Sequence, residues 1–245
     1  MSIWSPSSSG CGHVGPGRAG RSGSFLPAGR LALASCGCRR RPAAPGTGLY
    51  RGVVIRRALA RAYWATSRWS LRSQPYDTGR PTLLVGAPHT SNWDFVLMLA
   101  IAWSTGIHVR WLGKHTLFAG PAGPLMRALG GIPVDRRDPS RVVTDVVARI
   151  QAGEVFSLVV TPEGTRGVGS YWKSGFYRIA REAHLPVTLG YVDRTTMTTG
   201  LGPTIELTGD VRADMDVVRA FYADKSGVRP ALRTEPRLRE EDASA

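Results

Sequence analysis

The sequence predicts a single α/β domain in which helices flank a central, mostly parallel sheet. From Pro81 onward, short apolar runs typical of strands alternate with segments of helical periodicity, as in βαβ units. Polar motifs follow directly on two of these runs, at the strand ends where open α/β folds bind ligands. The chain has 245 residues, 42% of them hydrophobic, which is enough to bury one full core.

Residues 1–48 are expected to form a disordered basic tail. They contain 23 Gly, Ser and Pro without periodicity, which is too little apolar surface to offset chain entropy. Two interpretations of this tail fit its composition. The tail is Arg-rich and acid-free, as organelle transit peptides are. Alternatively, the sequence starts at an upstream start codon, which adds residues that the cell does not make.

Residues 49–76 are expected to be an amphipathic basic segment, helical up to about residue 73. Apolar residues recur there at spacings of three and four, and arginines share another face. The helix either lies on anionic lipid headgroups or packs on the domain with its arginines in water. The apolar face comprises Ile55, Ala58, Leu59, Ala62, Ala65 and Trp69, and the basic face Arg57, Arg61, Arg68 and Arg72.

The net charge of +14 is concentrated in these N-terminal segments. Residues 1–76 hold 12 Arg and no acid, whereas the rest of the chain holds 20 Lys and Arg against 18 Asp and Glu. The arginines lack the interleaved aromatic residues of a nucleic-acid platform, so no nucleic-acid partner is expected. All three cysteines precede residue 39, so the domain can form no disulfide and offers no thiol nucleophile, which fits a cytoplasmic protein.

Residues 77–228 are expected to form the folded domain. Its strands are apolar runs bounded by Gly, Pro or polar residues, and its helices show spacings of three and four, with Ser140 and Asp210 as caps. The longest apolar window has nine residues, far short of the ~20 that span a bilayer. A charged flexible tail, 229–245, should follow. The expected order is strand 82–87, helix 93–104, strand 107–112, helical region 116–129 interrupted at 120–124, strand 132–135, helix 140–151, strand 155–160, helix 175–183, strands 187–192 and 204–208, and helix 213–224.

The first candidate site lies between strand 82–87 and the helix that follows. Residues five apart within one helix point about 140° apart, so His89 and Asp94 can meet only with His89 in the loop and Asp94 in the first helical turn. Ser91 or Asn92 would then cap the helix. Asp94 could hold one ring nitrogen and leave the other basic, which predicts a general base with a carboxylate to orient it.

Two further motifs contain candidate anion-binding residues. Glu163–Arg166 follows strand 155–160, where Gly164 permits a tight turn and Arg166 can grip a phosphate or carboxylate. Glu163 would hold an arginine or a substrate hydroxyl. The run Gly130–Arg136 ends in a second candidate anion contact, Arg136. No metal-binding pattern is present in the sequence.

These motifs resemble those of the glycerolipid acyltransferase family, whose best-known members acylate 1-acylglycerol-3-phosphate to phosphatidic acid. His89 and Asp94 match the first motif, and the other three follow in order between about Pro81 and Gly190. The resemblance implies that His89 deprotonates the acceptor hydroxyl and that Asp94 orients His89. The second to fourth motifs are Gly130–Arg136, Glu163–Arg166 and Leu185–Val187, and the residues implied in acceptor binding are Arg136, Glu163, Gly164, Thr165 and Arg166.

The resemblance also implies the partners of the reaction. Acyl-CoA or acyl carrier protein would be the acyl donor, and a lysophospholipid would be the acceptor. The reaction would need no metal and no cofactor. The protein would bind peripherally to a membrane, on its cytoplasmic face. Pro88, Pro133 and Leu189 depart from the family pattern, so a lipid alcohol or an amine stays open as acceptor. A non-catalytic lipid- or anion-binding protein of the same fold is the alternative function. Residues 172–177 would line the acceptor or acyl site, or belong to the core.

Overall fold

The computed structural model describes residues 47–134 and 139–243, within the compact unit Ala44–Ala245. Seven strands form one sheet in which only the β6–β7 pair is antiparallel, so the predicted α/β fold with a mostly parallel sheet is confirmed. The predictions made for residues 1–46 lie outside the described residues. Across the sheet the strands are β1 (Ser70–Leu71), β7 (Thr198–Ile205), β6 (Val187–Asp193), β2 (Thr82–Ala87), β5 (Ser157–Val160), β3 (Val109–Lys114) and β4 (Gly131–Val134).

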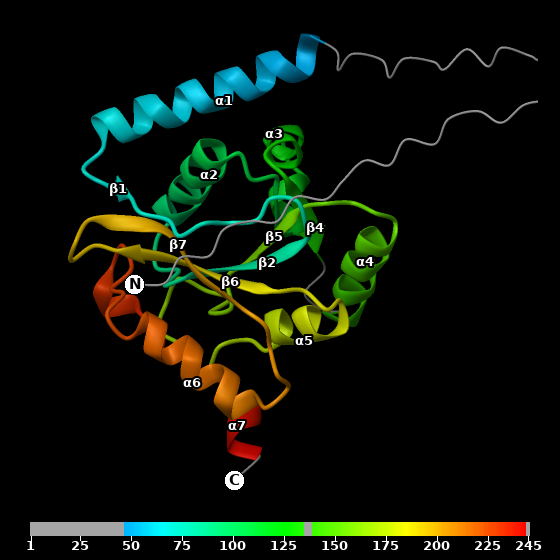
Figure 1. Cartoon of the computed structure of the whole chain (residues 1–245), viewed down its shortest axis with the longest axis vertical. Helices are drawn as coiled ribbons and strands as arrows, with labels where there is room; N and C mark the ends of the chain where they lie inside the picture. Colours follow the sequence, from blue (N-terminus) through cyan, green and yellow to red (C-terminus); the bar gives the residue numbers. More distant parts are fainter. Residues whose placement is uncertain (1–46, 135–138, 244–245) are drawn as a thin grey trace, which may run out of the picture. The chain divides into compact units, whose positions relative to one another are not determined.

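Helices cover both faces of the sheet. Figure 1 shows α2 and α3 on one face and α4, α5 and α6 on the other. These helices are amphipathic or wholly apolar, so each buries its apolar side against the strands. The helical elements are α1 (Thr47–Thr66), α2 (Trp93–Thr105), the 3-10 turn η1 (His115–Phe118), α3 (Gly123–Ala128), α4 (Pro139–Gln151), α5 (Gly175–Glu182), α6 (Val211–Tyr222), the 3-10 turn η2 (Pro230–Leu232) and α7 (Glu240–Ala243).

The central strand β2 divides the core into two layers. Leu83 and Val85 are fully buried with α4, α5 and α6, whereas Leu84 packs on the opposite face with α2 and β3. This alternation follows from the two-residue period of a strand, and both faces are apolar because both are covered. The centre of the sheet, where the first candidate motif begins, is therefore packed on both faces.

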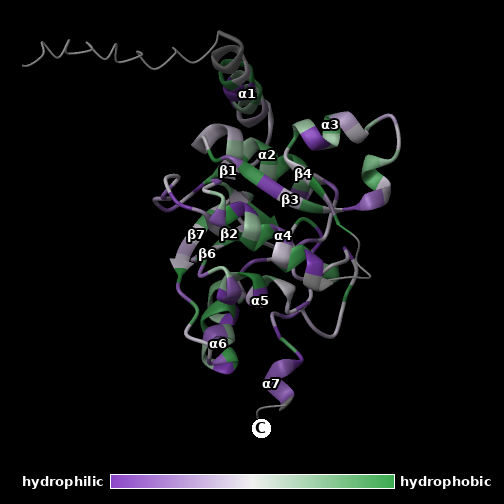
Figure 2. Cartoon of the chain, turned by 90° about the vertical axis from the view of Figure 1, so that its right-hand side faces the viewer, coloured by the Kyte–Doolittle hydropathy of each residue, from purple (hydrophilic) through white to green (hydrophobic). Residues whose placement is uncertain are grey.

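Helix α2 is apolar on all sides from Phe95 to Trp103. Figure 2 colours it green along most of its length, whereas α6 mixes purple with green and α7 is mostly purple. The reason is its position, since α2 is enclosed between the sheet and α1. Trp64 of α1 donates a hydrogen bond from its indole nitrogen to the Ser104 hydroxyl at 2.8 Å.

Helix α1 leaves the predicted apolar face in solvent. It ends at Thr66, not near residue 73, and between Gly52 and Thr66, where the side chains are described, only Ala60 is fully buried. Ile55 is 57% exposed and Leu59 53%. The interpretation in which this face packs on the domain is therefore wrong, because α1 contacts α2 through the side that carries Ala60 and Trp64.

The polypeptide after Arg229 is folded, so the prediction of a flexible tail is wrong for residues 229–243. Leu238 is completely buried, and Glu241 accepts an ion pair from Arg219 at 2.7 Å. The sequence pattern of isolated apolar residues among charges shows no periodicity, so it does not reveal that Leu238 and Glu241 pack on the domain. Strand β7 also begins at Thr198, six residues earlier than predicted, because glycines and threonines obscure its periodicity.

Candidate active site

The two main motifs meet because their strands are neighbours. β2 and β5 are parallel and paired, with Val85 opposite Val160. Parallel strands end at the same edge, so the loops that follow both strands emerge side by side. The loop after β2 carries His89 and the loop after β5 carries Glu163–Arg166, and the main chain of the first contacts the side chain of the second.

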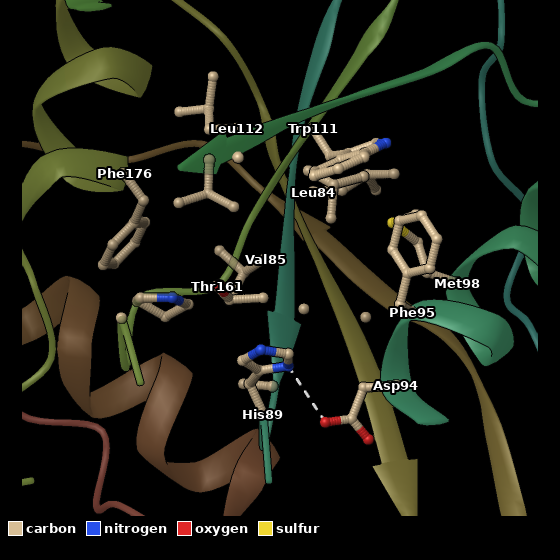
Figure 3. Close-up of a pocket in the computed structure, with 18 of the residues that line it drawn as sticks. Leu84, Val85, His89, Asp94, Phe95, Met98, Trp111, Leu112, Thr161 and Phe176 are labelled. Carbon is tan, nitrogen blue, oxygen red and sulfur yellow. Dashed lines mark ion pairs between the residues drawn. The ribbon is translucent and has the colours of Figure 1, made fainter. Parts of the chain in front are cut away.

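His89 and Asp94 form the predicted pair. Nδ1 of His89 lies 3.1 Å from Oδ2 of Asp94, and the His89 side chain is 20% exposed. This arrangement favours the tautomer with its proton on Nδ1, facing the carboxylate, and a lone pair on Nε2. Within the described residues Nε2 has no hydrogen-bond partner, and His89 borders a large cavity (Figure 3). The imidazole can thus accept a proton from a bound molecule.

The loop that holds His89 is organised around Asp94. Oδ2 of Asp94 accepts the backbone N–H groups of Thr90 and Ser91, each at 2.8 Å. The Ser91 hydroxyl accepts the N–H of Trp93 at 3.2 Å, whereas the Asn92 side chain makes no capping hydrogen bond. A carboxylate in the first turn is also favoured by the helix dipole. Asp94 thus orients the imidazole and closes the loop with the same oxygen.

Glu163 occupies a different place from the one predicted. Its side chain is only 4% exposed, and Oε2 accepts the backbone N–H of His89 at 2.5 Å. Burial raises the pKa of Glu163 to about 7, against the lowering effect of the His89 hydrogen bond. The predicted contact with acceptor is therefore corrected: Glu163 lies behind the His89 loop and supports it, because the neighbouring strand ends bring its carboxylate under this backbone.

The other residues of the Glu163–Arg166 motif border the cavity. Gly164 has a φ of +68°, and its N–H bonds to the Thr161 carbonyl at 3.1 Å, which makes the tight turn. Thr165 and Arg166 follow on the exposed side of this turn and border the same cavity as His89. Arg136, the other predicted anion contact, lies outside the described residues.

The cavity has a volume of about 1080 Å³ and extends along both faces of the sheet edge. Figure 3 shows His89 at its floor, with Phe95, Met98 and Trp111 on one side and Leu112 and Phe176 on the other. A space of this size exceeds that of most drug-sized ligand pockets. Its apolar walls suit hydrocarbon chains.

Cationic side chains border the cavity, and the motifs identified only one of them. Lys114 ends β3, and Lys173 and Arg178 flank the start of α5. The stem of Lys173 lies over the turn, since a Cβ on Gly164 would be 3.3 Å from its Cγ. The available sequence signals were the strand end at Lys114 and the segment 172–177 that contains Lys173, whereas Arg178 lies within a helix and belongs to no motif. Together with Arg166 they place four cationic side chains on the border of the cavity that His89 also lines.

The remaining candidate segments divide between core and cavity. Trp172 is buried in the core, whereas Lys173 and Phe176 border the cavity, so residues 172–177 serve both predicted purposes. The fourth motif is structural: the Pro186 carbonyl accepts the N–H of Leu83 at 2.9 Å, and Val187 begins β6 in the core.

Residues 71–191 match the family model described as Acyltransferase, which confirms the predicted family over the part of the chain that holds His89, Asp94 and Glu163–Arg166. No curated protein and no solved structure matches the chain.

Proposed function

Because residues 71–191 form an acyltransferase domain, we propose that this protein transfers a fatty acyl group from acyl-CoA or acyl carrier protein to the hydroxyl of a lysophospholipid such as 1-acylglycerol-3-phosphate. One observation carries the proposal: His89, paired with Asp94, borders a large apolar cavity with cations around it. This reaction needs a general base, a space large enough for an acyl chain, and groups that bind an anion.

The proposed mechanism requires one proton acceptor and no covalent enzyme intermediate. Nε2 of His89 removes the proton from the acceptor hydroxyl as its oxygen attacks the thioester carbonyl. The tetrahedral intermediate then collapses, the carbon–sulfur bond breaks, and the imidazolium returns the proton to the departing thiolate. The products are the acylated acceptor and the free thiol of the donor.

Asp94 and Glu163 would act through His89. Asp94 keeps the proton on Nδ1 and stabilises the imidazolium, as the carboxylate of a catalytic triad does. Glu163 fixes the backbone of the histidine through the hydrogen bond to its N–H. A base held in this way needs little reorganisation when the proton moves.

The cations favour an anionic acceptor. Arg166 and Lys173 border the cavity within the loops that follow β5, on the side of the site where the acceptor headgroup would lie. A guanidinium binds phosphate through two parallel hydrogen bonds, so Arg166 is the proposed headgroup contact and Lys173 a second charge beside it. Thr165 and the backbone of Gly164 complete this proposed acceptor site.

We also propose that the protein works at the cytoplasmic surface of a membrane, where its substrates reside. Within residues 47–134 and 139–243, none of the helices has the length and hydropathy needed to cross a bilayer. Helix α1 exposes Ile55 and Leu59, and the segment 47–66 contains no acidic residue. An apolar and basic helix of this kind suits an anionic lipid surface.

The decisive experiment is acyl transfer by the purified protein from labelled acyl-CoA and from acyl carrier protein to lysophospholipid, lipid-alcohol and amine acceptors. Wild-type protein should form the acylated lysophospholipid. His89→Ala should lower kcat by about 10² to 10⁴, the range that general base catalysis contributes. Asp94→Asn should fall in the same range because the wrong tautomer is then stabilised.

His108→Ala is the matched control, since His108 lies at the amino end of β3 and does not border the cavity. It should keep wild-type turnover. Turnover that survives His89→Ala would sink the assignment of the base. Lysolipid binding without thioester cleavage by wild-type protein would support the alternative of a non-catalytic lipid-binding protein.

A further inference from the structure

The polypeptide after α6 runs past both loops of the site. We call residues 226–238 the C-terminal strap. It lies entirely beyond residues 71–191, the part that matches the acyltransferase family. Its first residues join the sheet edge, where the Gly227 N–H bonds to the Val192 carbonyl at 2.9 Å. The strap is thus anchored at the strand that neighbours β2.

A chain of hydrogen bonds connects the strap to the catalytic pair. The backbone N–H of Arg229 donates to the Thr90 hydroxyl at 2.9 Å, and Thr90 is 1% exposed. The N–H of Thr90 donates to Asp94 Oδ2, the oxygen that faces His89 Nδ1. Buried hydrogen bonds of this type are costly to break, so the strap restrains the loop between His89 and Asp94.

Close packing reinforces this link. A Cβ at Gly227 would lie 3.0 Å from Pro88 Cβ and 3.0 Å from Thr90 Oγ1, and the φ of Gly227 is +69°. The backbone of the strap therefore rests directly on the residues on either side of His89. Only glycine permits both this conformation and this approach.

The strap contacts the second loop as well. The Thr234 hydroxyl, on a residue that is 2% exposed, accepts the N–H of Gly169 at 2.9 Å. Leu238 pairs as an isolated bridge with Trp172, whose N–H bonds to the Arg237 carbonyl at 2.8 Å. The Arg233 charge lies near enough to Glu163 to favour its ionised form.

We propose that the C-terminal strap is a positioning element of the active site, which holds the His89–Asp94 loop and the 163–172 loop in their catalytic arrangement. The proposal rests on the proposed function for its catalytic consequence. It assigns Thr90 and Gly227 as positioning residues that act through Asp94 and His89. The active site thus requires residues outside the segment that matches the family.

The first test compares two alanine substitutions at glycines with positive φ. Gly227→Ala forces the strap against Pro88 and Thr90, whereas Gly153→Ala imposes the same kind of backbone strain where no atom lies within 4 Å. Gly227→Ala should lower kcat about tenfold, because small displacements of reacting groups cost large factors in rate. The KM for the acyl donor should be unchanged, and Gly153→Ala should keep both constants.

The second test removes a single hydrogen bond. Thr90→Val keeps the shape and the backbone N–H but loses the acceptor for Arg229, so kcat should again fall about tenfold. Thr90→Ser restores the hydroxyl and should recover turnover relative to Thr90→Val. If the contribution were purely structural, Gly227→Ala, Thr90→Val and Thr90→Ser would all lower thermal stability. They would not then lower kcat while leaving KM unchanged.

Amide hydrogen exchange of the peptide 88–94 gives a readout that does not depend on turnover. Exchange at Thr90 and Ser91 should be faster in Gly227→Ala and Thr90→Val than in wild type and Gly153→Ala. Wild-type exchange and wild-type kcat in both Gly227→Ala and Thr90→Val would overturn the proposal. If wild-type protein transfers no acyl group, the proposed function fails, and the exchange rates alone then decide whether the strap holds the loop.

Discussion

Residue-scale chemistry in this site depends on two carboxylates with different tasks. Asp94 contacts the imidazole and two backbone N–H groups, whereas Glu163 contacts only the backbone N–H of His89. The deep burial of Glu163 makes its ionised form costly, which raises its pKa to about 7. The Glu163 side chain, which supports the backbone of His89, therefore changes its charge near neutral pH.

Glu163 should make the domain less stable as the pH rises. Its pKa is 4.5 unfolded and about 7 folded, so between these values the folded state binds more protons than the unfolded state. The free energy of unfolding should fall across this range by about 3 kcal/mol because of this residue. Glu163→Gln should lack this decline, as urea unfolding at pH 4.5, 6 and 8 would measure.

The difference between wild type and variant isolates Glu163 from the other titrating groups. Glu182→Gln, at a side chain that is 52% exposed on α5, is the control and should retain the wild-type pH dependence. Parallel pH profiles for wild type and Glu163→Gln would show that the buried carboxylate does not titrate in this range.

At the scale of elements, the helices differ in how completely they are covered. α2 is enclosed between the sheet and α1, which explains its apolar circumference. α1 is covered on one side only and exposes Val54, Ile55 and Leu59 together with its arginines. This is the combination that interfacial helices show, and it supports the proposal that α1 lies on the membrane.

Acidic substitutions on α1 should weaken membrane binding. Ile55→Asp with Leu59→Asp places charge on exposed positions, so the fold should persist while binding to anionic vesicles falls at least about tenfold. Sedimentation with phosphatidylglycerol vesicles measures the bound fraction. Val217→Asp on α6, at a valine that is 51% exposed, is the matched control. Equal binding by all three proteins would remove α1 as the attachment site.

At the scale of the whole described molecule, the sheet edge gathers the loops of several strands around one cavity. β2 contributes His89, β3 contributes Lys114, and β5 contributes Arg166. Apolar walls come from helices on both faces, so a single space combines hydrocarbon contacts with surrounding positive charge. This arrangement predicts selectivity for acceptors that are both apolar and anionic.

Arg166→Gln should therefore raise KM for phosphate-bearing lysolipids by about 10- to 100-fold, the value of one charged hydrogen-bonded contact. KM for an uncharged lipid alcohol should change little. Steady-state kinetics with matched acceptors tests this, and Arg149→Gln on α4, at an arginine paired with Glu154, is the control. A similar rise in KM for both acceptors would contradict a headgroup role for Arg166.

The local patterns of the chain were sufficient for much of the site. His89 and Asp94 could be paired because a strand end, a loop and a first helical turn leave one geometry open to residues five apart. The turn at Gly164 and the cation at Arg166 followed from residue type and position. The task of Glu163 could not be predicted, because residue type alone does not tell whether a carboxylate faces the ligand or the backbone behind it.

The sequence by itself determined the α/β fold, the order of the motifs and the pairing of His89 with Asp94, because these follow from periodicity and from contacts a few residues apart. Tertiary structure alone decided the support of His89 by Glu163, the exposure of the apolar face of α1, the cations around the cavity and the C-terminal strap. Each of these depends on residues far apart in sequence, such as Thr90 and Arg229, whose proximity is set by how the strands pair and the helices pack.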